Sequence, residues 1–462
     1  MHKIIVTFGT RPEIVKMAPV VEELNRCPEV EVTIVHSGQH YDFEMSRIFI
    51  KELEVPEPDL ELRIRPGSHA EQTAQMLVGY ERIFRKVRPD LVLAEGDTNT
   101  VLATALTSLK LQIPFGHVEA GLRCYDLLMP EEINRTVADH CAQLCFAPTV
   151  RAALNLSREG IAPKRILITG NTIVDSCLKH YKISKRKSKI LSTLGFTPDE
   201  PYIVATFHRA ENVDNPERLR QIISALTRLK GCKIVCPVHP RTKIRLTKFG
   251  LWQKMRLEHI IVIPPLGYWD FLQLVANSKL VLTDSGGLQE EALTLRVPCL
   301  TLRHSTERPE TIELGANVLV GTAADKIVGS ATKILQDNDF ARKMKPKFNP
   351  FGDGKAGKRI ARICRRKCEQ GIEIESPSYF DRGSAYFKLL PIDGKFIDLT
   401  VKDLMRMNPG FVITTVFDKH GNPLFPSPQL RVREGWSVEL FGEPAHMESH
   451  AIQDEATHSS KR

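Results

Sequence analysis

Acidic side chains lie at three successive turns in the first half of the chain. Asp97 follows the apolar run LVLAEG, Glu119 ends IPFGHVE, and Glu131 lies in MPEEINR. If these carboxylates meet at one edge of a sheet, their mutual repulsion would raise a pKa toward the range useful for proton transfer. The alternative is that each one caps its own helix, as Asp97 would do for a helix that begins near Thr98.

Basic side chains lie beside the start of the first predicted helix. In FGTRPEIVK, Pro12 and Glu13 favour a first helical turn, and Arg11 and Lys16 flank that turn. A helix N-terminus with nearby cations is suited to an anionic group. Two unrelated surface cations are the alternative that the spacing leaves open.

A glycine pair marks the corresponding turn in the second half. In LTDSGGLQEEA, Ser285, Gly286 and Gly287 precede a helix that carries Glu291, and Arg308 lies in the next turn, TERPE. Glycine lets a phosphate approach backbone N–H groups, arginine can pair with a pyrophosphate, and glutamate can hold ribose hydroxyls. These residues predict a site for a nucleoside diphosphate.

Two histidines follow strands of the same half, His208 in ATFHRAE and His239 in PVHPR. A histidine at the carboxyl end of a strand can carry a proton or donate to a phosphate, although an isolated one is more often structural. The predicted strand-to-helix turns contain neither G-x-G-x-x-G nor a Walker sequence. The sequence therefore does not favour a nicotinamide or ATP site.

Short apolar runs alternate with helical stretches up to about residue 320, which is typical of parallel sheets with crossover helices. The runs are mostly continuous, as strands covered on both faces should be. The predicted strands are residues 4–8, 32–36, 91–94, 114–118, 144–147, 166–169, 202–206, 233–237, 260–263, 280–283, 299–302 and 318–320. We predict an α/β protein with two Rossmann-like, doubly wound domains that face a cleft, where such sheets bind ligands.

Changes in composition predict the domain boundaries. The basic segment YKISKRKSK, residues 181–189, is expected to connect the domains. The predicted units are a first domain (residues 1–180), a second domain (181–370), a linker (371–385), a small α+β module (386–445) and a disordered tail (446–462).

Taken in order, the motifs closely resemble those of the non-hydrolysing UDP-N-acetylglucosamine 2-epimerases, which have the glycosyltransferase-B fold. The matching motifs are FGTRPE, GQHYDFEMS, EGDTNT, GHVEAGLR, MPEEINR, ITGNTIVD, HRAENVDN, PVHPR, LTDSGGLQEEA, TERPE and NPFGDGKAGKRI. The resemblance implies that UDP is eliminated from UDP-GlcNAc to give a 2-acetamidoglucal and is then added back to give UDP-ManNAc. It also implies that the last helix of the second domain packs back, and that neither a metal nor a cofactor takes part.

The same resemblance implies roles for individual residues. The acid-base and proton-handling positions are Asp97, Glu119, Glu131 and His208, with no assignment of which one removes the C2 proton. The UDP-binding positions are Arg11, Phe271 at the uracil, Ser285, Gly286, Gly287, Glu291 at the ribose and Arg308. Lys16 is included with the substrate-binding residues because of its place beside the first predicted helix. Without the resemblance, Phe271 would be interpreted as a core residue of an amphipathic helix. A second UDP-GlcNAc, acting as an activator, would lie near Gln39, His40, Arg65 and His239.

The chain continues beyond this resemblance. Its segment from LPIDGKF to EGWSVELFG resembles the RCK C-terminal (TrkA-C) module of potassium-transport regulators. Such modules usually dimerise and can bind a small ligand. The resemblance therefore implies a homodimer and a regulatory ligand at the C-terminal module.

Three other functions stay open. The same chemistry could act on a UDP-2,3-diacetamido sugar acid, or it could end in hydrolysis to free ManNAc and UDP. A nucleotide-sugar sensor without catalysis is the third. A sensor would need the UDP-binding residues but not the four acid-base residues, so the presence of all four disfavours it.

Composition and charge bear on other classes of protein. The chain has 462 residues, 42% of them hydrophobic and 26% charged, and its opening residues predict neither a signal sequence nor a membrane span. Its net charge of +9 is concentrated in residues 341–368, which hold eleven Lys or Arg and one Asp. We therefore expect a cytoplasmic enzyme with no nucleic-acid or membrane partner. The ten cysteines lack zinc-site spacing and are expected to be reduced thiols, so no metal is expected.

Overall fold

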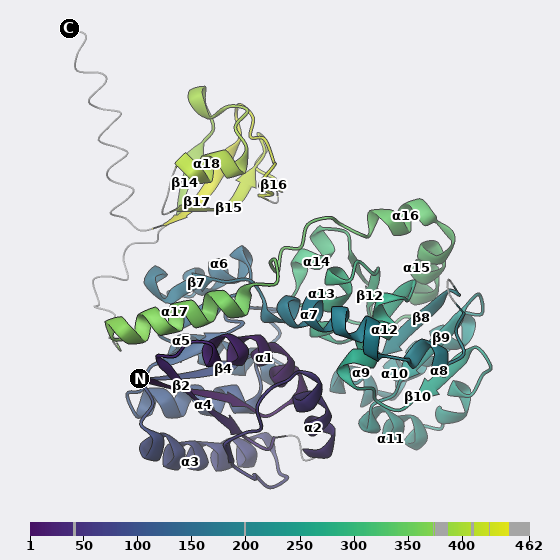
Figure 1. Cartoon of the computed structure of the whole chain (residues 1–462). Coiled ribbons are helices and arrows are strands. Elements are labelled where there is room, and N and C mark those ends of the chain that lie inside the picture. Colours follow the sequence, from purple (N-terminus) through teal and green to yellow (C-terminus); the bar gives the residue numbers. More distant parts are fainter. Residues whose placement is uncertain are drawn as a thin grey trace.

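The computed structural model describes residues 1–39, 43–197, 200–372, 374, 387–407, 411–424 and 426–442. Within these residues the chain forms two parallel α/β domains and a small antiparallel module (Figure 1). The predicted fold class is therefore confirmed. His40 and residues 446–462, the predicted tail, lie outside the described residues, as does most of the predicted linker.

The first domain contains a seven-stranded parallel sheet of order β3-β2-β1-β4-β5-β6-β7. Its strands are β1 (His2–Phe8), β2 (Val30–His36), β3 (Leu60–Glu61), β4 (Leu91–Glu95), β5 (Phe115–Val118), β6 (Leu144–Ala147) and β7 (Ile166–Ile168). Its helices are α1 (Arg11–Asn25), α2 (Phe43–Glu52), α3 (His69–Val87), α4 (Asn99–Lys110), α5 (Pro130–Cys141), α6 (Val150–Arg158) and α7 (Thr172–Lys187). Ile4 and Val6 pack on one face of the sheet and Ile5 on the other, which explains the continuous apolar runs.

The second domain contains a six-stranded parallel sheet, β10-β9-β8-β11-β12-β13, which repeats the order β3-β2-β1-β4-β5-β6 of the first sheet but, within the described residues, has no counterpart of β7. Its strands are β8 (Tyr202–Thr206), β9 (Lys233–Pro237), β10 (Ile260–Ile263), β11 (Leu280–Thr283), β12 (Cys299–Thr301) and β13 (Asn317–Leu319). Its helices are α8 (Ile190–Thr193), α9 (Ala210–Val213), α10 (Pro216–Arg228), α11 (Pro240–Lys248), α12 (Tyr268–Ala276), α13 (Gly286–Thr294), α14 (Pro309–Glu313), α15 (Ala324–Gln336) and α16 (Asn338–Lys343). Every predicted strand of both domains is present, and only the two-residue β3 was not predicted.

The chain passes between the two domains twice, and the two connecting segments are in contact. The backbone N–H of Asn171 donates to the carbonyl of Phe351 at 2.7 Å. After the second crossing, α17 (Ala356–Gln370) packs against α1 and adds Ile360 and Cys364 to the core of the first domain. A single core therefore includes both the start and the end of the two-domain unit.

Residues 181–189, which are predicted to connect the domains, are helical for most of their length, because α7 continues to Lys187. Three of the five basic residues of this segment, residues 185–187, lie in the last turn of the helix. Cations at a helix C-terminus interact favourably with the helix dipole, so they extend the helix rather than end it. The boundary predicted at residue 180 accordingly falls inside a continuous helix.

The C-terminal module contains an antiparallel sheet of order β14-β17-β15-β16. Its elements are β14 (Phe387–Pro391), α18 (Val401–Met407), β15 (Phe411–Phe417), β16 (Pro423–Leu424) and β17 (Ser437–Gly442). Its own core contains Val401, Leu404, Val416 and Val438. In the described part of the whole chain, no helix combines the length and the apolar character needed to cross a membrane.

Candidate functional site

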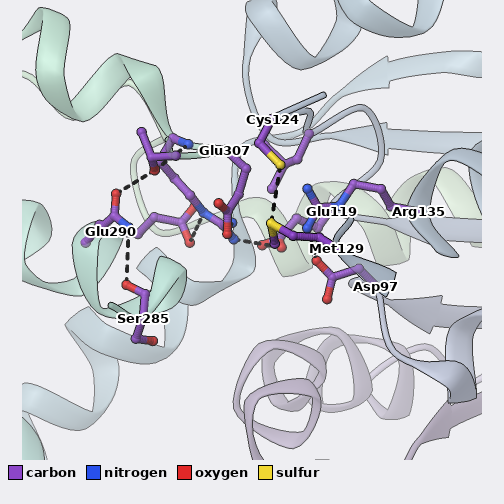
Figure 2. Close-up of polar contacts among 12 residues, drawn as sticks. Asp97, Glu119, Cys124, Met129, Arg135, Ser285, Glu290 and Glu307 are labelled. Atoms are coloured by element: carbon purple, nitrogen blue, oxygen red, sulfur yellow. Dashed lines mark hydrogen bonds and ion pairs between the residues drawn. The ribbon is translucent and has the colours of Figure 1, made fainter. Parts of the chain in front are cut away.

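The carboxyl ends of the two sheets meet at a buried network of charged side chains (Figure 2). At its centre is Glu119, which follows β5. One oxygen, Oε1, lies 2.7 Å from Nζ of Lys16 and 3.0 Å from Nη2 of Arg308, and the other, Oε2, accepts from Nδ2 of Asn171 at 2.7 Å. Glu119 has a φ of +69°, a conformation that side chains rarely adopt and that occurs often at functional sites. It therefore joins predicted residues of both domains.

Arg308 is surrounded by carboxylates. Its Nη2 contacts Glu119, its Nη1 lies 2.7 Å from Oε1 of Glu307, and its Nε lies 3.3 Å from Oε2 of Glu290. Burial alone would raise the pKa of Glu307, but Arg209, Arg308 and Arg303 together hold it well below its usual range. The arginines of the second domain at this site therefore surround a glutamate, Glu307, that stays negatively charged.

Asp97 lies beside the network, on the loop after β4. Its carboxylate pairs with the guanidinium of Arg135, which also lies 2.7 Å from Oε2 of Glu132. The prediction that Asp97 caps the next helix is wrong: the cap of α4 is Thr98, whose Oγ1 accepts from the backbone N–H of Thr100 at 3.1 Å. The side chain of Asp97 is therefore directed to a cation instead of to the helix.

The predicted rise in pKa by repulsion between acidic turns is wrong for Asp97 and Glu119. Burial would raise the pKa of both groups, but Arg135 lowers that of Asp97, and Lys16 and Arg308 lower that of Glu119. The rise occurs deeper in the network, where burial raises the pKa of Glu290 to about 7 and that of Glu95 well above its usual value. Cations placed between the predicted carboxylates keep those groups ionised.

Glu131 and His208 lie at the edge of the network. Glu131 is half-buried in the first turn of α5, and His208 follows β8 with its side chain 46% exposed. Desolvation and the nearby charges of Arg209 and Arg11 lower the pKa of His208, although Asp284 opposes them. The shift favours the neutral imidazole, which can accept a proton.

The predicted phosphate loop lies at the start of α13. Ser285 is the N-cap residue of α13, with Gly286 and Gly287 in its first turn. A Cβ on Gly286 would lie 2.5 Å from Oε1 of Glu307, whereas a Cβ on Gly287 would meet nothing within 4 Å. The start of α13 is thus packed on one side and open on the other, so a phosphate can approach the open side.

The predicted nucleoside end lies on α12 and α13. Glu291 is buried and accepts a hydrogen bond at 2.9 Å from the hydroxyl of Tyr268. Burial raises the pKa of Glu291 to about 7. Phe271 is half-buried and packs against a core cluster of the second domain, so its placement is compatible with both interpretations of it.

The other predicted residues occupy separate places. The guanidinium of Arg11 lies over the ring of Phe49 at 5.6 Å, and Oε1 of Gln39 accepts from the backbone of Thr100 at 3.0 Å. The ring of His239 lies 5.9 Å from that of His208, whereas Arg65 is exposed on the loop before α3. No group of three His, Cys, Asp or Glu side chains within the described ranges is arranged to hold a metal ion.

A family model described as UDP-N-acetylglucosamine 2-epimerase matches residues 22–365 of this chain. The chain belongs to the UDP-N-acetylglucosamine 2-epimerase family. A Methanococcus maripaludis protein of that name is 45% identical over 79% of this chain and 98% of its own length. The UDP-2,3-diacetamido-2,3-dideoxy-D-glucuronate 2-epimerase of Pseudomonas aeruginosa is 40% identical over 78% of this chain and 98% of its own length.

Solved structures of the epimerase family have the same fold. The Methanocaldococcus jannaschii UDP-GlcNAc 2-epimerase, crystallised in complex with UDP-GlcNAc and UDP, has a TM-score of 0.74 and is 45% identical. The match covers 79% of this chain and 99% of that one. The C-terminal module lies outside the residues that the family model matches.

The sequence did not indicate several residues of the buried network of charged side chains. They are Glu95, Asn171, Glu307 and Arg135. Glu95 carried a usable signal, because it is a charged residue that ends a strand of otherwise apolar side chains. Asn171 lay in a recognised motif, but its two hydrogen bonds to Glu119 and Glu290 depend on the packing of the domains.

Glu13 gives this epimerase a pH-dependent stability. Its carboxylate accepts from the backbone N–H groups of Gly9 and Thr10, and burial raises its pKa from 4.5 to about 7 against the opposing effect of its hydrogen bonds. Between pH 4.5 and about pH 7, the folded chain therefore holds a proton that the unfolded chain has released. The free energy of unfolding falls as the pH rises through this range. Glu13→Gln should reduce the loss of unfolding free energy between pH 5 and pH 8 by about 2 to 3 kcal/mol, measured by urea unfolding.

A matched control for this prediction is Glu71→Gln, since Glu71 fills the same capping-box position in α3. Glu71 is exposed, and hydrogen bonds from Ser68 lower its pKa. Between pH 5 and pH 8, Glu71→Gln should lose at least as much unfolding free energy as the wild type. Equal pH dependence in the wild type and Glu13→Gln would contradict the prediction.

Proposed function

We propose that this chain is an isomerase that interconverts UDP-GlcNAc and UDP-ManNAc by eliminating and re-adding UDP through a 2-acetamidoglucal. The observation that carries the proposal is the position of Glu119, in contact with Lys16 and Arg308 at once. A carboxylate of the first domain and an arginine of the second, suited to binding phosphate, thus meet where the two domains come together. Membership of the family and the names of its relatives support the same chemistry.

The reaction makes two demands on the site. A C2 proton beside an acetamido group is not acidic, so a positioned base and a stabilised leaving diphosphate must share the barrier. We assign the diphosphate to Arg308, Arg11, Ser285 and the backbone N–H groups of Gly286 and Gly287. Lys16 holds Glu119 in place and offsets its charge.

Inversion at C2 needs proton handling on both faces of the sugar. Asp97, Glu119 and Glu131 belong to the first domain, and His208 belongs to the second. We therefore propose that the carboxylates and the neutral imidazole act from opposite walls of the cleft. Glu291 and Phe271 would hold the ribose and the uracil, and Gln39, His40, Arg65 and His239 would lie near a second UDP-GlcNAc.

Product analysis tests this proposal and separates it from the alternatives. Purified protein incubated with UDP-GlcNAc should give UDP-ManNAc, resolved by anion-exchange chromatography, with no free ManNAc. Free ManNAc and UDP would instead indicate the hydrolysing reaction. The Pseudomonas aeruginosa relative makes the diacetamido sugar acid the second candidate substrate, so the two UDP-sugars should be compared by kcat/KM. Binding without turnover of either sugar would indicate a sensor.

We further propose that the C-terminal module is a TrkA-C-like regulatory unit of a cytoplasmic homodimer. In support, β15 packs against α6 (Figure 1). Arg158 at the end of α6 lies 4.0 Å from Glu439 of β17. The other end of α6 reaches the second domain, where Thr149 donates to Glu310 of α14 at 2.7 Å. Helix α14 directly follows Arg308, so α6 connects the module with the phosphate side of the site.

A charge exchange tests the role of this contact. Arg158→Glu should weaken docking of the module and change kcat/KM by about twofold, the size expected for one exposed ion pair. The double variant Arg158→Glu, Glu439→Arg should restore the wild-type value. Steady-state kinetics that are equal in all three proteins would contradict a regulatory contact at α6.

A further inference from the structure

The C-terminal end of α2 meets the N-terminal end of α12 across the domains. Glu52, the last residue of α2, accepts a hydrogen bond from the backbone N–H of Tyr268 at 2.5 Å and another from that of Trp269 at 3.2 Å. The N-cap residue of α12 is Gly267, which has no side chain to cap the helix. A carboxylate of the first domain thus satisfies the helix end of the second.

The glycine at this helix start fits tightly against Glu52. A Cβ placed on Gly267 would lie 2.4 Å from Oε1 of Glu52, well inside contact distance. Alanine would suit the backbone of Gly267, which has a φ of −64°. Glycine at residue 267 therefore makes room for the carboxylate of Glu52, and the backbone conformation at this position does not require it.

The capped end of α12 leads directly to the proposed nucleotide residues. The hydroxyl of Tyr268 donates to Glu291 at 2.9 Å, and its ring lies 6.3 Å from the ring of Phe49 in α2. The guanidinium of Arg11 lies over that same Phe49 ring. Helix α2 thus touches residues assigned to the phosphate and, through Tyr268, to the ribose.

We propose that Glu52 is a positioning residue that fastens α12 to the first domain and so holds Glu291 and Phe271 in place for the uridine. This inference rests on the proposed function, because it takes the ligand to be a UDP-sugar. Glu52 itself touches neither the sugar nor the phosphates. Its loss should weaken nucleotide binding much more than it slows the chemical step.

Two variants remove the contact from opposite sides. Glu52→Ala deletes the carboxylate, and Gly267→Ala displaces it by steric conflict. Each should raise the KM for UDP-GlcNAc and the Kd for UDP, measured by calorimetry, about tenfold, with kcat changed less than threefold, as expected for the loss of a charge-assisted helix cap. Because both variants remove the same contact, the double variant should be no worse than either single one.

Two further variants separate positioning from general damage. Glu52→Gln keeps an acceptor oxygen and should recover part of the UDP affinity. Glu54→Gln is the matched control, because Glu54 is the neighbouring exposed carboxylate and pairs with Lys179 at 3.3 Å rather than with α12. It should bind UDP as the wild type does.

The outcomes distinguish this inference from the proposed function. A UDP Kd within twofold of the wild type in Glu52→Ala, or additive effects in the double variant, would overturn the inference. If the wild type bound UDP but formed no UDP-ManNAc, the proposed function would fail while the affinity comparison still tested Glu52. Amide hydrogen exchange of the free protein gives a ligand-independent test: Tyr268 and Trp269 should exchange faster in Glu52→Ala, and equal rates would overturn the inference.

Discussion

Replacing Glu119 by Gln is expected to lower kcat about 10³-fold, since Glu119 is the carboxylate that contacts both Lys16 and Arg308. The amide keeps the shape of the side chain but loses the negative charge that these two cations stabilise. The unfolding free energy should also fall by about 3 kcal/mol, because a buried charge network loses one partner. Steady-state kinetics and urea unfolding measure the two effects.

Glu95→Gln is the matched control for this variant. Glu95 lies 2.8 Å from Nζ of the same Lys16. In the chain of ion pairs, Lys16 and Glu119 separate Glu95 from Arg308. Burial raises the pKa of Glu95 well above its usual value, whereas Lys16 and Arg308 hold that of Glu119 below its usual value, so the loss of the charge should matter less at Glu95. Its kcat should stay within about tenfold of the wild type. A kcat loss in Glu95→Gln as large as in Glu119→Gln would contradict the central role of Glu119.

The second large effect is expected for Arg308→Ala. This change leaves the carboxylates of Glu119, Glu290 and Glu307 without their shared cation. The unfolding free energy should fall by about 3 to 5 kcal/mol, and kcat/KM for UDP-GlcNAc should fall about 10³-fold. Calorimetry should show a matching loss of affinity for UDP.

Arg308→Lys separates charge from geometry. Three different nitrogens of the guanidinium reach three carboxylates, and a single ammonium group cannot reproduce that arrangement. The lysine variant should therefore recover more of the stability than of the activity. Wild-type affinity for UDP in Arg308→Ala would contradict the assignment of this residue to the diphosphate.

The fold could be predicted from the sequence because its main signals are local. Strands such as β1 and β4 are covered on both faces, so their residues are apolar without alternation. The sequence did not show that α7 continues to Lys187, because a cationic helix end and a connecting segment are both rich in Lys and Arg.

The site could be predicted only in part, because residue spacing says nothing about which charges face each other. The acidic turns at Asp97 and Glu119 were found, but their pKa values shift down instead of up. Arg135 causes the shift of Asp97, and Lys16 and Arg308 cause that of Glu119. These three cations come from other parts of the chain, and Arg308 comes from the other domain. Glu95 and Glu290 carry the raised pKa values because they lie deeper in the same network.

The most direct test of the account is the fate of the C2 hydrogen in deuterated water. Elimination and re-addition of UDP require that the C2–H bond break and that a solvent-derived proton return to that carbon. UDP-GlcNAc and UDP-ManNAc recovered after incubation with the wild-type protein should both contain deuterium at C2, detected by mass spectrometry and proton NMR. Epimerisation without deuterium at C2, or no turnover of UDP-GlcNAc at all, would contradict the account.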